Sequence, residues 1–214
     1  MNATERNKAL YVAELFHQVF GIQVPVYIPY GSREHYTAGH YPDITLMPGQ
    51  EAEAVSWMGT SVFGAFTLAG GAYQTYARDG RIETLTMPDF VMPYATLVDF
   101  QQNMNITQTR TVGNNGTVKE VYGLDDWTIS IRGLCLNDDF RPTHPTAHRQ
   151  AQALTAWRNL ACSIEVVGRQ FLEKKIHNIV IQSLAIRPVQ GKSDVVSFEI
   201  EALSDEAIEL IDIL

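Results

Sequence analysis

The chain has 214 residues, of which 45% are hydrophobic and only 19% charged, and its formal net charge is −8. Phosphate backbones are bound by clustered lysine and arginine, so this balance excludes a large nucleic-acid footprint. No run approaches the roughly 18 apolar residues of a membrane helix, and the first residues show no secretion signal. We therefore expect a protein made in the cytoplasm, and the low charge indicates a surface partly covered by neighbours.

The N-terminal segment has the apolar spacing of a helix from Thr4 to Phe20, with Phe16 on its apolar side, and Gly21 is expected to end it. This broad apolar side either packs into the core or docks on a partner chain. Prolines then recur through residues 22–50, so the stretch that holds Tyr27 and Tyr30 is predicted to be an edge strand or a wrapped arm.

Two hairpins are predicted next. Residues 73–77 and 81–87 flank Asp79-Gly80, a strong turn signal. Residues 104–112 and 117–122 flank a turn rich in Asn and Gly, and the second hairpin is polar over much of both faces. Because such a ribbon gains little from its own burial, we expect it to lean on another subunit or to line a wet lumen. Its candidate interface residues are Thr107, Thr109, Thr111, Asn114 and Asn115.

The last ninety or so residues alternate strands with one long helix. Residues 127–133, 162–167, 179–186 and 195–203 have strand patterns, and Pro188 is expected to break the third. The helix is predicted to begin at Pro145 with Thr143 or His144 as its cap, and a second helix to begin at a Ser204 cap. Strands outnumber helices, so the predicted fold class is α+β and mostly β, with one flanking helix.

Residues that could carry chemistry are sparse. His144 and His148 lie near Asp138 and would suit a metal-dependent hydrolase, but the glutamate of the metalloprotease pattern is missing. Cys135 and Cys162 are expected to be buried free thiols in apolar runs, and two thiols alone do not hold a structural zinc. Neither a Gly-x-Ser-x-Gly elbow nor a complete phosphate loop occurs. We therefore predict no enzyme, no metal and no cofactor.

From about Met87 to Leu210 the chain resembles small baseplate proteins of contractile phage tails and related injection systems, notably those of Bacteroidetes and their phages. The order of elements also looks like that of tail-terminator proteins at the tube end. The residues that carry the resemblance belong to strands and turns: Gly116–Glu120, Gly123–Trp127, Ile129–Gly133, Ile176, Ile179–Ile181, Gly191-Lys192, Val196–Phe198 and Leu203–Glu206.

The resemblance implies a tail-tube-like β-sandwich or barrel over residues 87–214, repeated in a homo-oligomeric ring. Residues 1–86, with the helix, the arm and the first hairpin, would then be specific to assembly. A subunit of this kind joins the tail tube or hub to the baseplate of a virion or injection particle without breaking a bond. The competing hypotheses are a monomeric ligand-binding or carbohydrate-binding module using the aromatic residues of 26–41, and the hydrolase above.

Overall fold

The computed structural model describes residues 3–22, 26–28, 46–48, 54–55, 61–62, 66–77, 79–93, 95–110, 113, 116–137 and 143–206, with side chains from residue 11 onward except in 26–62. The helices and strands run in the order α1 Ala3–Phe20, β1 Val26–Ile28, β2 Leu46–Pro48, β3 Ala54–Val55, β4 Ser61–Val62, β5 Thr67–Leu68, β6 Gly71–Tyr76, β7 Ile82–Met87, β8 Phe90–Val91, β9 Thr96–Arg110, β10 Thr117–Leu136, α2 Ala147–Arg158, β11 Ile164–Val167, α3 Arg169–Leu172, β12 Asn178–Val189 and β13 Lys192–Ser204.

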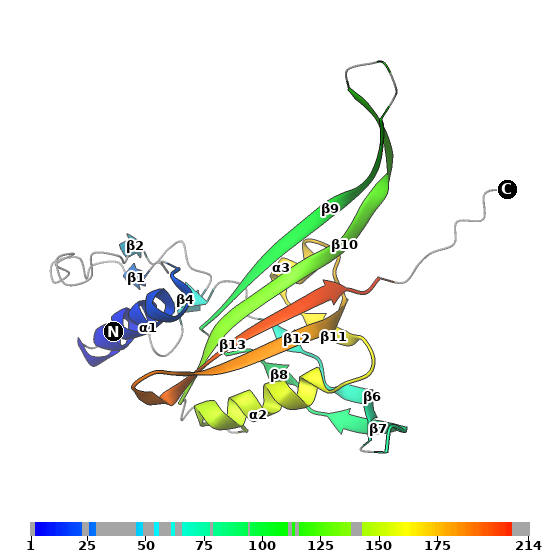
Figure 1. The fold of residues 1–214 in the computed structure, drawn as a ribbon. Coiled ribbons are helices and arrows are strands. Elements are labelled where there is room, and N and C mark those ends of the chain that lie inside the picture. Colours follow the sequence, from blue (N-terminus) through cyan, green and yellow to red (C-terminus); the bar gives the residue numbers. More distant parts are fainter. Residues whose placement is uncertain are drawn as a thin grey trace.

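Seven antiparallel strands form the main sheet, in the order β8-β5-β11-β12-β13-β10-β9, and β6 with β7 forms a separate hairpin. The predicted mostly-β fold with few helices is confirmed, and a closed barrel or a sandwich stays a prediction. Figure 1 shows β9 and β10 projecting from one end of the sheet as a long ribbon, while α2, β6 and β7 lie at the other end.

One face of the sheet carries the larger core. Side chains alternate along a strand, so Ile129 and Ile131 of β10 lie on the same face as Phe198 and Ile200 of β13. The buried side of α2 covers this face, with Trp157 among its residues. Phe66, Leu68, Tyr73 and Met87 belong to the same cluster. Residues 66–87 therefore pack beside residues 90–204, and the boundary after residue 86 stays a prediction.

The opposite face of the sheet carries a smaller core under α1. Val12, Leu15 and Phe16 of α1 are buried with Leu134 and three more residues from the sheet and its approach, Ala95, Val189 and Val195, and Leu97 is partly buried beside them. The helix runs from Ala3 to Phe20, as its apolar spacing predicts, and Gly21 ends it with φ at +68°. The apolar side of α1 thus packs within its own chain.

Four sequence predictions are corrected by the structure. Strand 127–133 and the second arm of the 104–122 hairpin are one strand, β10, and its partner β9 begins at Thr96. The cap of α2 is Thr146, whose backbone is extended and whose hydroxyl accepts from the Arg149 N–H, so the helix begins at Ala147. The other two corrections concern Pro188 and Ser204.

Pro188 lies inside β12 instead of ending it. Strand β11 pairs with β12 only at Asn178 and Ile179, so among the described residues the later part of β12 is an edge, where proline is tolerated. Ser204 is the last residue of β13, and its hydroxyl accepts a hydrogen bond from the Trp127 backbone N–H at 3.0 Å instead of capping a helix. The remainder of the predicted final helix lies outside the described residues.

A close approach between β10 and β13 makes Gly133 a sensitive position. A Cβ there would lie 2.6 Å from the Phe198 ring and 2.7 Å from the Ala95 carbonyl oxygen. We expect Gly133→Ala to lower the free energy of unfolding by about 1–3 kcal/mol, the usual cost of overpacking, in urea denaturation. Gly71→Ala is the matched control, because its new Cβ would meet nothing closer than 3.4 Å. Equal stability of the two variants would contradict the packing described here.

Tyr73 gives the core a dependence on alkaline pH. Its hydroxyl donates to the Ala69 carbonyl at 2.6 Å, and its ring packs edge-on against Trp157. Burial, with a smaller contribution from the Glu165 carboxylate, raises the pKa of Tyr73, while a backbone hydrogen bond at Glu165 opposes it. The folded state therefore keeps the phenol proton longer than the unfolded chain, and this stability is present below about pH 10 and lost as pH rises.

We expect Tyr73→Phe to lose about 0.5–1.5 kcal/mol of unfolding free energy at pH 8 through the missing hydrogen bond. The difference from the wild type should shrink above about pH 10, because the unfolded wild-type chain has then lost the Tyr73 phenol proton and must regain it on folding, a cost that the variant lacks. Urea denaturation at both pH values measures this. Tyr76→Phe, at an exposed position, is the control and should change stability by less than about 0.5 kcal/mol. A difference that stays constant with pH would be the contrary result.

Candidate assembly interface

The outer part of the β9–β10 ribbon has no cover within the chain. Every described residue in 103–110 and 116–126 is exposed, although the two strands stay paired from Thr117 with Arg110 to Leu124 with Met104. The inner part of β10 is different, because Thr128 to Gly133 pairs with β13 on one side and β9 on the other. The ribbon is therefore an anchored hairpin whose outer part makes no core.

Apolar side chains gather on one face of the outer ribbon. The register places Met104 opposite Leu124 and Ile106 opposite Val121, and all four are exposed, Leu124 by 68% and Val121 by 60%. We call these four residues the apolar ladder. Exposed apolar neighbours on a sheet are typical of a surface that another chain covers.

The apolar ladder continues the core face of the sheet. Residues two apart on a strand share a face, so Met104 and Ile106 follow Val98 and Phe100 along β9. Phe100 is still covered, since Phe171 of α3 lies 5.1 Å from its ring and the Lys174 ammonium lies 4.4 Å above it. The intramolecular cover ends there, and the same face runs on exposed.

Thr107 and Thr109 lie on the other face of the ribbon, opposite Glu120 and Val118. Both threonines are exposed, as are their partners. Thr111, Asn114 and Asn115 lie outside the described residues, and so does Tyr30. Tyr27 falls in β1, which pairs in parallel with β2, and its side chain is likewise outside the description. The role of these residues in assembly stays a prediction.

Of the two phenylalanines predicted for an interface, Phe16 is buried and Phe20 is partly buried. Their ring centroids lie 5.4 Å apart at the end of α1, beside the smaller core. Phe16 is only 2% exposed, so the chain itself already covers that side chain. A role for α1 between subunits stays a prediction and would have to use the residues around this contact.

Two irregularities in β10 lie in the ribbon, one between the two pairs of the apolar ladder and one at the ribbon base. The register shifts between Val121 and Gly123 and again between Leu124 and Trp127, so β10 holds residues without a partner on β9. Gly123 has φ at +141°, a conformation that glycine adopts at low cost. The Gln102 side chain donates to the Asp125 carbonyl at 3.0 Å, and this bond spans the second shift. Such bulges bend and twist a strand.

Charges at the ribbon base are acidic. Asp125 and Asp126 are both exposed, and neither carboxylate has an ion-pair partner within the described part of the chain. Further out, the Tyr122 hydroxyl donates to the Glu120 carboxylate at 2.5 Å, and this hydrogen bond raises the pKa of Tyr122. The ribbon therefore presents carboxylates close to the apolar ladder.

On the face of the sheet that carries α1, the area that the helix does not cover is polar, and most of its charged side chains contact one another. Arg132 forms an ion pair with Asp99 across β10 and β9. Arg187 pairs with Glu199 at 2.8 Å, and Ser130 donates to Glu201 at 2.9 Å. Two ion pairs and one hydrogen bond to a carboxylate therefore lie across neighbouring strands on this face.

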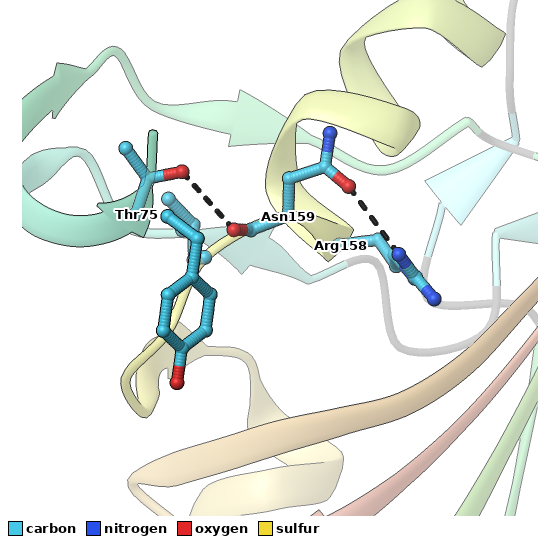
Figure 2. Close-up of a pocket in the computed structure, with 5 residues that line it drawn as sticks. Thr75, Arg158 and Asn159 are labelled. Carbon is cyan, nitrogen blue, oxygen red and sulfur yellow. Dashed lines mark hydrogen bonds between the residues drawn. The ribbon is translucent and has the colours of Figure 1, made fainter. Parts of the chain in front are cut away.

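A hollow of about 460 Å³ lies where the end of α2 meets β6, and Thr75, Tyr76, Arg158, Asn159 and Leu160 line it. Figure 2 shows the Thr75 hydroxyl donating to the Asn159 carbonyl, at 3.1 Å, and the Arg158 guanidinium beside the Asn159 side chain. Tyr76 is 65% exposed, and its cross-strand neighbour Ile82 is 58% exposed. This hollow combines apolar side chains with one cation.

The histidines of the hydrolase hypothesis do not form a metal site with other described residues. His148 is exposed on α2, and the ring of His144 lies edge-on to Phe90 at 5.4 Å. Asp138 lies outside the described residues, and among those described no group of three or more His, Cys, Asp or Glu side chains is placed to hold a metal. Cys135 and Cys162 form no disulfide, as predicted; Cys135 is buried, also as predicted, whereas Cys162 is half-buried. No described helix is long and apolar enough to cross a membrane.

Sequence reasoning identified the ribbon but missed the apolar ladder. The polar residues of 104–122 dominate the pattern, and the register that sets Leu124 beside Met104 depends on the first shift in β10. The exposed pair Tyr76 and Ile82 was also missed, although the Asp79-Gly80 turn predicts their pairing. Two apolar residues that flank a tight turn were the available signal.

No curated protein matches the sequence. Among solved structures, a chain from the tail of an empty GTA particle with C6 symmetry is similar over 64% of this chain and 93% of its own length, with 14% sequence identity and a TM-score of 0.33. The family model described as Domain of unknown function (DUF6046) matches residues 91–212, which is more than half of the sequence and includes the ribbon, α2 and strands β11 to β13. The chain therefore belongs to this family, the Domain of unknown function (DUF6046) family.

Proposed function

We propose that the protein is a structural subunit of a tail-like particle, a tube-end or baseplate component that assembles into a ring and joins the tube or hub to the baseplate. The observation that carries the proposal is the exposed outer ribbon with its apolar ladder. A two-stranded ribbon without a packed face is marginal in water. Such a ribbon is stabilised when a neighbouring subunit covers its apolar side chains, so an exposed ribbon is expected in a protein that assembles.

Unpaired strand edges support the proposal further. Among the described residues, β9 has β10 as its sole strand neighbour, and β12 beyond Ile179 has β13 as its sole strand neighbour. Both edges present rows of backbone N–H and C=O groups, which another strand can join by hydrogen bonds. A protein with one such edge at each side of its sheet can extend the sheet into the next copy.

The mechanism is geometric. Each copy offers one edge and receives another, which is a heterologous contact, and such contacts close into a ring when the rotation between copies allows it. The paired charges on the uncovered face, such as Arg132 with Asp99, need no partner of opposite charge. The resemblance of residues 87–210 to small baseplate proteins supports the same role. No step of this role needs a catalytic group, a metal or a cofactor.

The ribbon should be required for incorporation and dispensable for folding. We expect the double variant Ile106→Lys with Val121→Lys to disappear from particles purified from cells that make this chain together with its neighbouring tail proteins. Both side chains are exposed, so the unfolding free energy should change by less than about 0.5 kcal/mol. Labelled negative-stain microscopy and mass spectrometry of the particles measure incorporation.

Leu172→Lys is the matched control, because Leu172 is an exposed apolar residue at the end of α3, outside the ribbon. Thr107→Lys tests whether the other face of the ribbon also contributes, and we expect it to reduce incorporation less than the ladder variant does. If the wild-type chain is absent from every tail-like particle, the proposed function is wrong. If the ladder variant is incorporated as well as the wild type, the apolar ladder is not required for assembly into the particle.

A further inference from the structure

Two exposed apolar surfaces lie at opposite ends of the molecule. The apolar ladder lies on the projecting ribbon, and the hollow with Tyr76 and Ile82 lies at the other end, beside α2 and the β6–β7 hairpin (Figure 1). We propose that the ladder of one copy docks into the hollow of a second copy, head to tail. This inference deepens the proposed function, on which it rests, by assigning the ribbon's partner.

The two surfaces have complementary relief. A paired ribbon is a ridge, and the apolar ladder puts two cross-strand pairs, Met104 with Leu124 and Ile106 with Val121, on one side of it. The receiving surface is concave, with a volume of about 460 Å³. Ile82 extends its apolar rim, because it lies directly across from Tyr76 on the same face of the hairpin. Several aliphatic side chains fit a hollow of this size.

The rim of the hollow is held in place before any partner arrives. The Ala161 N–H donates to the Gln74 carbonyl at 2.6 Å, and the Gln74 N–H donates to the Cys162 thiol sulfur at 3.2 Å. Thr75 forms a bridge with Leu160 and a hydrogen bond to Asn159. These bonds fix β6 against the segment after α2. Preformed sites lose less conformational entropy on binding.

The charges beside the two surfaces are opposite. Asp125 follows Leu124 directly, and with Asp126 it places next to the ladder two carboxylates that have no ion-pair partner in the described part of the chain. At the hollow, Arg158 has no carboxylate partner among the described residues, and α2 contains no acidic residue. The neighbouring Arg81 is already paired with Asp79 at 3.3 Å. A ridge with two carboxylates at its base and Lys119 on its outer side thus faces a hollow that contains the cation Arg158.

A second copy is the occupant that these observations favour, because one chain holds both halves of the match. In Figure 1 the outer ribbon projects from the end of the sheet opposite α2 and β6, whose residues line the hollow, so the ladder of one molecule cannot reach its own hollow. The contact is heterologous, since ladder meets hollow and never ladder. Each added copy therefore presents a new ladder and a new hollow, and the contact links copies in series.

A mixing experiment with two complementary variants tests this directly. The ladder variant carries Val121→Glu and Leu124→Glu, and the hollow variant carries Tyr76→Glu and Ile82→Glu. All four positions are exposed, so thermal denaturation should show both variants folded. Analytical ultracentrifugation of the full chain should show concentration-dependent association of the wild type below about 100 μM, and monomers for each variant alone.

An equimolar mixture of the two variants should restore one contact for each pair and stop at a heterodimer. The intact ladder of the hollow variant can enter the intact hollow of the ladder variant, and the remaining surfaces are blocked. Monomers in the mixture would overturn the proposal, as would a wild type that stays monomeric at about 100 μM. Association of the hollow variant as strong as that of the wild type would instead mean that the ladder binds a different surface. Leu172→Glu is the control and should associate normally.

Charge reversal supplies a second readout. Asp126→Lys should weaken association by about tenfold, and adding Arg158→Glu should restore much of it, because the pair is then reversed. Lack of rescue, with both single variants unimpaired, would count against the pairing of these surfaces. The proposed function fails separately: wild-type copies that associate head to tail but never appear in tail-like particles would leave this contact standing and remove the function. If particles contain the chain but the mixture of variants shows no heterodimer, the proposed function stands and the contact between ladder and hollow is wrong.

Discussion

The structure depends on the double pairing of one strand. Strand β10 is hydrogen-bonded to β13 and to β9 over Thr128–Gly133, and this shared stretch fixes which side chains face α2 and which face α1. A shift of one residue would turn Ile129 and Ile131 away from the larger core and bring polar neighbours into it. The close approach of Gly133 to Phe198 allows little room for such a shift. The outer ribbon, which precedes Trp127 in β10, takes its direction from this anchored segment.

Sequence patterns predicted most of the elements, and their failures have physical causes. Helix α1, the β6–β7 hairpin and strand β13 follow from periodicity and from the Asp79-Gly80 turn. The continuity of β10 did not, because Gly123, Asp125 and Asp126 have the composition of a turn and lie in bulges that only the pairing with β9 reveals. Pro188 in β12 was misjudged for a similar reason, since an edge position cannot be recognised before the sheet order is known. Of the interface residues, the ribbon was identified by its two strands, whereas the apolar ladder requires the register.

Folding and association use different parts of the sheet. The face under α2 buries aromatic and branched residues and supplies most of the core, and its outward continuation is the apolar ladder. The other face holds α1 at one end and paired charges elsewhere. Substitutions in the outer ribbon should therefore leave folding intact, whereas substitutions at Phe198 or Trp157 should not. This separation lets surfaces between copies change while the fold persists.

The alternation of side chains along the ribbon limits how its length can vary. One residue added to each arm would move Ile106 and Val121 to the threonine side, whereas two residues added to each arm keep them where they are. A strand advances about 3.3 Å per residue, so permitted lengths differ by steps of about 7 Å. If ribbons of related chains set the distance between successive copies, that spacing is quantised, and relatives should differ by even numbers of residues per arm. The ribbon would then fix the distance between copies in steps of two residues, the repeat of side-chain alternation in a β-strand.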